Sequence, residues 1–143
     1  MKNYINVEFP SIEVNEAFAR ATAGVFATQL EITMEELEDI KTAVSEAVTN
    51  AIIHGYCEKR GIVKMKCEIH NDIIEIEVSD DGCGIPDVSL AMQPLYSNSK
   101  YEERSGMGFT VMQSFMDTLS VKSEVGKGTK VIMTKKVGAT CEN

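Results

Sequence analysis

Several features that would assign a protein to a common class are missing from this sequence. It has no run of about 18 or more apolar residues, and its start contains neither a hydrophobic leader segment nor a small-residue cleavage site. We therefore expect a soluble protein that is not exported. Lys and Arg total 14 against 22 Asp and Glu, and they form no basic run. Because phosphate binding needs clustered cations, this disfavours a nucleic-acid surface and favours a protein as any macromolecular partner.

Metal-binding and disulfide patterns are also missing. The four cysteines, Cys57, Cys67, Cys83 and Cys141, include no C-x-x-C pair and have no paired histidines nearby. We expect four free thiols, which favour a reducing, cytoplasmic compartment. The familiar nucleotide fingerprints are lacking as well, since "VGKGTK" does not have P-loop spacing and no G-x-G-x-x-G run occurs. Any nucleotide site must therefore use a different architecture.

What is present is enough for one compact domain. The chain has 143 residues, of which 43% are hydrophobic, and it shows no linker or internal repeat. We expect a single domain over residues 1–137 and a frayed tail over 138–143. Periodicity is lost between about 86 and 105, apart from one predicted helical turn near Val88–Met92. An irregular insert of this length is typical of a functional lid or a disordered segment.

The N-terminal segment predicts a strand followed by a helix. "YINVEFP" alternates apolar and polar residues and stops at Pro10, which indicates a strand. Ser11 is the expected cap of a helix that runs to about Leu30. The predicted core stripe of this helix, at three- and four-residue steps, is Val14, Phe18, Ala21 and Val25.

A second helix is predicted from about Met34 to His54, and Gly55 ends it. Thr33 and Glu36 have the spacing of a capping box, in which each side chain accepts a hydrogen bond from a backbone N–H at the helix start. The predicted core stripe of this helix is Leu37, Ile40, Val44, Ala47 and Ala51.

Two predicted hairpins and a third helix complete the pattern. Alternating runs over 62–69 and 73–80 predict one hairpin, and the runs on either side of the late "GKG" predict another. "GMGFTVMQSFMDTL", which precedes the second hairpin, predicts the helix. The elements together indicate an α+β fold, with a mostly antiparallel sheet and helices gathered on one face.

The second predicted helix carries an unusual polar pair, Glu46 and Asn50. They are four residues apart, so they share a face beside the apolar stripe. A lone carboxylate there must find a partner or shift its pKa, because burying an unpaired charge is costly. One interpretation places Glu46 at the rim of the helix and bonds Asn50 to a neighbouring backbone group. The other is a pocket in which Asn50 supplies a hard oxygen to Mg²⁺ and Glu46 accepts or orients a proton.

Two glycine runs favour the pocket. "DDGCGIPD" places Asp80 at a predicted strand end, and Gly82 and Gly84 let the backbone that follows approach a ligand closely. "SGMGF" places Gly106 and Gly108 at a helix start, where unpaired N–H groups and the helix dipole suit phosphate. Each run alone is weak, because Asp-Gly pairs make ordinary turns and glycines are frequent near helix starts.

Taken together, these runs carry a family resemblance. In order and spacing, "EAVTNAIIHGY", "DDGCGIPD", "GMGFTVM" and "GKGT" resemble the N, G1, G2 and terminal boxes of the GHKL ATPase/kinase superfamily. Over about Tyr4–Lys136 the chain is similar to stand-alone anti-sigma factor serine/threonine kinases, most closely to their sporulation, sigma F-type branch. The resemblance implies a Bergerat ATP-binding fold, a two-layer sandwich of sheet and helices with an ATP lid over about 86–105.

The resemblance also implies which residues would bind the base of ATP. Asp80 would accept a hydrogen bond from the adenine amino group, and Thr129 would support the same end of the pocket. Gly82 and Gly84 would let the backbone pass close to the base and ribose.

At the phosphate end, the resemblance implies that Glu46 orients or deprotonates the attacking hydroxyl and that Asn50 coordinates Mg²⁺. Arg104 would stabilise charge during phosphoryl transfer, which depends largely on positioning and electrostatics. The residues expected to contact the β- and γ-phosphates are Arg104, Ser105, Gly106 and Gly108, and Met107 is a further candidate cofactor-binding residue.

Partners follow from the same resemblance. The protein would bind and inhibit a sporulation sigma factor and would phosphorylate a serine of an anti-anti-sigma antagonist, with ADP and ATP biasing which partner is held. Arg20 is a candidate sigma contact, although it also fits an ordinary solvated helix position. We expect a homodimer through the N-terminal strand and first helix, because "YINVEFP" is a candidate exposed sheet edge.

Four alternatives remain. A stress-response anti-sigma kinase differs from the sporulation type only in overall likeness. An ATP hydrolase is one alternative. A histidine-kinase catalytic domain is another, and it is disfavoured because neither His54 nor His70 has the surroundings of a phosphoacceptor on a dimerisation helix. A nucleotide-gated binding module without kinase activity would not need a base such as Glu46.

Overall fold

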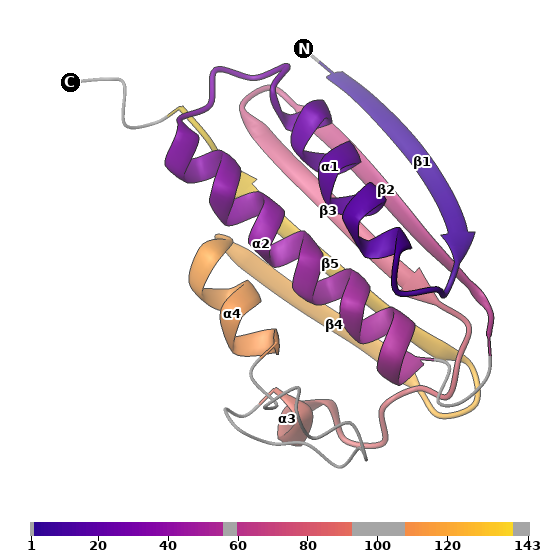
Figure 1. The fold of residues 1–143 in the computed structure, drawn as a ribbon. Helices are drawn as coiled ribbons and strands as arrows, with labels where there is room; N and C mark the ends of the chain where they lie inside the picture. Colours follow the sequence, from indigo (N-terminus) through magenta and orange to yellow (C-terminus); the bar gives the residue numbers. More distant parts are fainter. Residues whose placement is uncertain (1, 56–59, 93–107, 139–143) are drawn as a thin grey trace.

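A computed structural model describes residues 2–55, 60–92 and 108–138 (Figure 1). The strands are β1 (Lys2–Pro10), β2 (Ile62–His70), β3 (Ile73–Asp80), β4 (Thr118–Glu124) and β5 (Gly128–Lys136). The helices are α1 (Asn15–Ala27), α2 (Met34–Asn50), the π-helical turn η1 (Ala51–Gly55), α3 (Val88–Ala91) and α4 (Gly108–Phe115). The predicted hairpins and the single turn within the 86–105 insert are confirmed.

The strands form one sheet in the order β1-β2-β3-β5-β4, and every neighbouring pair is antiparallel. Helices α1, α2 and α4 lie across one face of this sheet, while α3 lies at one end and contacts β4 (Figure 1). The predicted α+β sandwich with helices on one face is therefore confirmed. No helix within the described ranges is long and apolar enough to cross a membrane.

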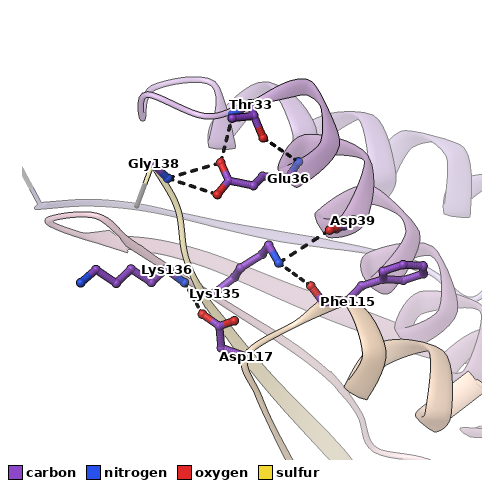
Figure 2. Close-up of polar contacts among 8 residues, drawn as sticks. All are labelled: Thr33, Glu36, Asp39, Phe115, Asp117, Lys135, Lys136 and Gly138. Carbon is purple, nitrogen blue, oxygen red and sulfur yellow. Dashed lines mark hydrogen bonds and ion pairs between the residues drawn. The ribbon is translucent and has the colours of Figure 1, made fainter. Parts of the chain in front are cut away.

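The start of α2 is the predicted capping box. The Thr33 hydroxyl accepts a hydrogen bond from the Glu36 N–H at 3.0 Å, and a Glu36 carboxylate oxygen accepts one from the Thr33 N–H at 3.0 Å. The Gly138 N–H also points at this carboxylate, 3.3 Å from each oxygen (Figure 2). Glu36 therefore satisfies the helix start and also holds the chain just beyond β5.

The core lies between the helices and the sheet. Burial alternates along β2 and β3, so that one face of each strand is hidden under the helices. Large side chains with no or almost no exposure include Ile40, Val44, Val48, Met65, Ile69, Ile74, Ile76, Val78, Met112 and Met133. The opposite face of the sheet carries ion pairs such as Lys66–Glu68 and Lys130–Glu77. This amphipathic division fixes which strand residues face the helices and the site.

Helix α1 reverses the predicted orientation of its apolar stripe. The residues that α1 buries are small or aromatic: Ala19, Ala23, Gly24, Phe26 and Ala27. The predicted core residues Val14, Phe18 and Val25 are 61%, 64% and 71% exposed, and Ala21 is exposed as well. The prediction was wrong because periodicity identifies an apolar face without showing what covers it, and the small residues allow α1 to pack closely beside α2.

Two further details of the helices differ from expectation. Ser11 does not cap α1, whose N-cap residue is Val14 with no side-chain bond. The Ser11 hydroxyl instead accepts a hydrogen bond from the Gly61 N–H at 2.9 Å, which ties the end of β1 to the start of β2. The predicted second helix does reach Gly55, but its final turn, after Asn50, is π-helical.

The cysteines also differ from the prediction of four free thiols. Cys67 is free and buried in β2, and burial raises its pKa to about 12, so the thiol stays neutral and unreactive. Cys83 is disulfide-bonded, and the prediction is wrong for this residue. Cys57 and Cys141 lie outside the described residues.

Candidate functional site

The helix-facing side of the sheet changes from apolar to polar at one end. Two successive rows across β3, β5 and β4 are apolar: Ile76, Met133 and Leu119, then Val78, Val131 and Val121. The next row consists of Asp80, Thr129 and Ser123. Because side chains two apart on a strand share a face, this polar row continues the core surface beyond the point where it stops being apolar. Such a change marks the place where the core ends and a binding surface begins.

Asp80 is the most conspicuous member of this row, since it is a carboxylate with only 7% exposure. Burial raises the pKa of Asp80, while the backbone N–H groups of Gly82 and Thr129 act to lower it and the charge of Asp81 raises it further. The Gly82 N–H donates to one carboxylate oxygen at 2.9 Å. A buried carboxylate of this kind is suited to accept a hydrogen bond from an N–H group of a ligand.

Glycines let the loop after β3 pack directly against the β4–β5 turn. Gly84 has φ of +78°, and a Cβ there would overlap the carbonyl oxygen of Glu124. Gly128 has φ of +116°, and a Cβ there would overlap the carbonyl oxygen of Asp80. The Gly126 N–H donates to the Cys83 carbonyl at 2.8 Å, which joins the loop to the turn. Gly84 of "DDGCGIPD" and Gly128 of "GKG" are therefore required by the packing of the loop against the turn.

The second part of the site lies between α2 and α4. Glu46 and Asn50 are half-buried on α2, and Gly108 begins α4 opposite them. A Cβ added to Gly108 would lie 2.9 Å from Asn50 Nδ2 and 3.2 Å from Glu46 Oε1. A side chain at position 108 would force Asn50 or Glu46 to shift, and the close approach sets the α4 start, whose N–H groups lack intrahelical partners, beside a carboxylate and an amide.

The π-helical turn η1 connects the two parts of the site. It follows Asn50 directly and contacts both β3 and β5. In Figure 1 the C-terminal end of α2, the end of β3 and the β4–β5 turn lie at the same end of the molecule, near α3. π-Turns inside helices occur frequently at functional sites, and this one begins at the residue after a proposed ligand-binding amide.

Lys135 of β5 anchors the far end of α4. Its ammonium donates to the Phe115 carbonyl, the last residue of α4, at 2.7 Å and lies 3.7 Å from Asp39 of α2 (Figure 2). The side chain is only 13% exposed, and a cation at a helix C-terminus complements the helix dipole. Sequence reasoning assigned Lys135 no role, although its place on the helix-facing side of β5 follows from strand alternation with Val131 and Met133.

The structure brings together most of the predicted site residues that it describes. Asp80, Gly82, Gly84 and Thr129 gather at the sheet end, and Glu46, Asn50 and Gly108 gather between the two helices. Arg104, Ser105, Gly106 and Met107 lie outside the described residues. Ser123 was missed by sequence reasoning, although its position opposite Thr129 in the final hairpin was the available signal.

Arg20, the candidate partner contact, lies on α1. Its Nε donates to the Glu16 carboxylate at 2.9 Å, and the Ser45 hydroxyl of α2 donates to the same oxygen at 2.7 Å. The Arg20 side chain remains 42% exposed. The guanidinium is thus held in place by its neighbours while part of it stays accessible.

Comparison with known proteins identifies this arrangement. Residues 11–135 match the family described as "Histidine kinase-like ATPase domain". The chain is 56% identical to the anti-sigma F factor of Thermoanaerobacter sp. (strain X514) over 137 residues, which are 96% of each chain. The chain belongs to the anti-sigma F branch of the histidine kinase-like ATPase domains. The anti-sigma F factor of Clostridium acetobutylicum (strain ATCC 824) is 53% identical to the chain over 136 residues, which are 95% of each chain.

Solved structures agree on the fold of this family. A crystal structure of the RsbU and RsbW domains of a Mycobacterium tuberculosis protein superposes on 94% of the chain with a TM-score of 0.68. The chain covers 32% of that larger protein and is 16% identical to it, so the likeness concerns the fold alone. Membership of an ATPase-domain family implies that the chain binds a nucleotide.

The described residues fit a nucleotide with its metal ion. The start of α4 offers a phosphate N–H groups that lack intrahelical partners, and Asp80 offers a buried acceptor for a base. Within the described ranges no group of three or more His, Cys, Asp or Glu residues is arranged to hold a metal. Mg²⁺ that arrives with a nucleotide does not need such a cage, because phosphates and waters supply most of its ligands. An amide oxygen such as that of Asn50 is a suitable hard ligand.

Proposed function

We propose that this chain is an anti-sigma factor that binds a sigma F-type sporulation sigma factor and also acts as an ATP-dependent protein serine kinase. Its substrate would be an anti-anti-sigma antagonist, which phosphorylation inactivates. The observation that carries the kinase part is the convergence of Glu46 and Asn50 on Gly108 at the start of α4. Family membership supports the nucleotide, and the names of the 53–56% identical relatives support the sigma partner.

The base would bind at the polar row of the sheet. Asp80 would accept a hydrogen bond from the adenine amino group, with Thr129 beside it, and the backbone at Gly82 and Gly84 would lie along the base and ribose. The buried position of Asp80 supports this role, because a carboxylate removed from water gains most from a donor that the ligand brings.

Phosphoryl transfer would take place between α2 and α4. Bound Mg·ATP supplies the phosphoryl group, with charge on its phosphate oxygens neutralised by the metal. Asn50 would coordinate Mg²⁺, and Glu46 would orient or deprotonate the serine hydroxyl that attacks the γ-phosphorus. Gly106, Gly108 and the lid residues Arg104 and Ser105 would surround the β- and γ-phosphates, with Arg104 stabilising the charge of the transferred group. Met107 would contribute to binding the same nucleotide.

A transfer assay tests this proposal. Labelled γ-phosphate of ATP is offered to a candidate antagonist with Mg²⁺, beside the variants Glu46→Gln and Asn50→Ala. We expect serine phosphorylation by the parent and a loss of at least about a thousandfold in Glu46→Gln with nearly unchanged ATP affinity, because a base acts only on the transfer step. Transfer that survives Glu46→Gln would refute the role of the base.

In a second candidate function, the chain binds a nucleotide but does not catalyse phosphoryl transfer. In a nucleotide-gated binding module, ATP or ADP would set only the affinity for sigma. Tight ATP binding by the parent, with no label on any candidate antagonist, would favour this module over the kinase. Glu46 beside Gly108 favours the kinase, because binding alone does not require a carboxylate facing the phosphate site.

The sigma contact is assigned to the exposed side of α1 near Arg20. The ion pair with Glu16 fixes the guanidinium in a presented position, which lowers the entropy lost when a partner binds. The variant Arg20→Glu should weaken sigma binding at least about tenfold without changing ATP affinity. Unchanged sigma affinity, measured by calorimetry, would remove Arg20 from the interface.

We also propose that two copies associate through β1 and α1. β1 is an edge strand, and the neighbouring outer surface of α1 exposes Val14, Phe18 and Val25. A second copy of the chain would pair with the free edge and cover these side chains. Light scattering at micromolar concentration should give a dimer for the parent. Phe18→Ser should shift it toward monomer, whereas Met34→Ser, at a 73% exposed position at the start of α2, should not.

A further inference from the structure

The polar row at the nucleotide end of the sheet has a third member, Ser123, which the proposed function leaves without a role. Ser123 lies near the end of β4 and pairs with Thr129 of β5, which in turn pairs with Asp80 of β3. The two rows before it are apolar on all three strands. A hydroxyl at this position is therefore out of place in the core pattern.

The Ser123 hydroxyl joins three segments of the chain. It accepts a hydrogen bond from the Ile85 N–H at 2.6 Å, in the loop after the second glycine of "DDGCGIPD". It donates to the Gly128 carbonyl at 3.0 Å, at the start of β5. Its oxygen also lies 2.8 Å from the Thr129 hydroxyl oxygen. An apolar side chain could not make these contacts.

The hydrogen bonds of Ser123 determine which hydroxyl donates in the contact between Ser123 and Thr129. A hydroxyl has one hydrogen to donate and two lone pairs to accept with. Because the Ser123 hydrogen goes to Gly128, the hydrogen in the contact between the two hydroxyls must come from Thr129. Thr129 has then used its only donor, and its oxygen has only acceptor capacity left for a ligand.

We propose that Ser123 is a positioning residue that fixes the Thr129 hydroxyl as an acceptor and thereby selects a purine with an amino group over one with an oxo group. The inference rests on the nucleotide site of the proposed function. Asp80 and Thr129 then present neighbouring acceptors at the same row of the sheet. A purine amino group donates hydrogen bonds to these acceptors. A 6-oxo group is itself an acceptor, so Asp80 and Thr129 would face it without a hydrogen-bond donor.

The loop keeps other attachments when the Ser123 hydroxyl is removed. The Gly126 N–H still donates to the Cys83 carbonyl, and the Gly82 N–H still donates to Asp80. A Ser123→Ala variant is therefore expected to fold. Its Thr129 hydroxyl is free to rotate and to donate its hydrogen to an oxo group, so that discrimination between the purines falls.

Dissociation constants for ATP and inosine triphosphate, measured by calorimetry, test the inference. We expect the parent to prefer ATP, and Ser123→Ala to lower the ratio of the two affinities roughly tenfold, which corresponds to about one hydrogen bond. Ser123→Thr retains the hydroxyl and should restore the ratio. Ser120→Ala is the matched control, because Ser120 is exposed on the same strand and belongs to the opposite face.

A second variant keeps the test independent of how well Ser123→Ala folds. Thr129→Val preserves the shape of the side chain and removes its hydroxyl, so it should also lower the ratio, and adding Ser123→Ala to it should lower the ratio no further. An equal loss of affinity for both nucleotides in Ser123→Ala, with an unchanged ratio, would overturn the inference and leave the nucleotide site intact. Failure of the parent to bind either nucleotide would instead overturn the proposed function.

Discussion

Two regions of this molecule depart from the rule that apolar side chains lie inside and polar ones outside, and they do so in opposite directions. The outer surface of α1 exposes Val14, Phe18 and Val25 to solvent. The end of the sheet that is proposed to bind the nucleotide holds the Asp80 carboxylate almost completely buried. In the first region apolar surface is left uncovered, and in the second a charge is removed from water. Each departure lowers the stability of the isolated chain, and the proposed explanation of each is a ligand or partner that binds there.

The comparison of these two regions separates nucleotide binding and transfer from self-association of the chain. Substitutions at the nucleotide end should change ligand binding and transfer without changing association, and substitutions on the outer surface of α1 should do the reverse. α2 lies between these regions and contacts both α1 and α4. Its packing against the sheet provides the fixed support that both regions require.

The largest expected effect that separates the regions comes from Gly108→Ala. The new Cβ would lie 2.9 Å from Asn50 Nδ2 and 3.2 Å from Glu46 Oε1, so either α4 or the two side chains must move. Because a displacement of about 1 Å in a phosphoryl-transfer site costs roughly a hundredfold, we expect transfer to fall by about that factor. Kinetics at saturating ATP provide the measurement, and light scattering should show unchanged association.

The next prediction compares one substitution on the two helices. Val44 of α2 has no exposure and Val25 of α1 is 71% exposed. Val44→Ala removes buried methyl groups and should lower the free energy of unfolding by about 2 kcal/mol. Val25→Ala should change it by less than about 0.5 kcal/mol when the chain is monomeric. Urea unfolding at low protein concentration measures both.

The same pair of variants sharpens the comparison at higher concentration. Linked association stabilises the folded chain more as its concentration rises. The free energy of unfolding of the parent and of Val44→Ala should rise with protein concentration, and that of Val25→Ala should rise less. Equal gains in all three proteins would show that the outer surface of α1 is not an interface between copies.

The smallest expected effect concerns the cost of burying Asp80. Its pKa in the folded chain is raised above the ordinary value of 3.8, so Asp80 favours the folded state at acidic pH and this contribution is lost as pH rises through the folded pKa. Asp80→Asn should therefore gain stability relative to the parent at pH 7, and this gain should shrink below pH about 4. Urea unfolding at the two pH values gives the comparison.

Asp80→Asn should also bind ATP at least about tenfold more weakly, because the amide is uncharged and accepts a weaker hydrogen bond from the base. A variant that is more stable and binds less well would show that the buried carboxylate serves the ligand. A variant that loses stability at pH 7 would show instead that Asp80 supports the fold through its bond from Gly82.

Much of the fold was predictable from local patterns. Strand alternation placed the hairpins, and the Thr33/Glu36 spacing placed the start of α2, because both depend on contacts within a few residues. Errors arose where a distant partner decides the outcome. Ser11 bonds to Gly61 instead of capping α1, and the apolar stripe of α1 faces outward because small residues on the other side pack against α2.

For the site, the sequence alone determined the kinds of residue and the order of the four boxes, since a carboxylate, an amide and the glycines are chemical identities that do not depend on the fold. The tertiary structure decided which of them meet. Gly108 reaches Glu46 and Asn50 only because α4 packs on α2, and Ser123 reaches Ile85 only because the β4–β5 hairpin packs beside the loop after β3. These contacts join residues far apart in the chain, and their distances are set by packing and strand pairing, which no local pattern records.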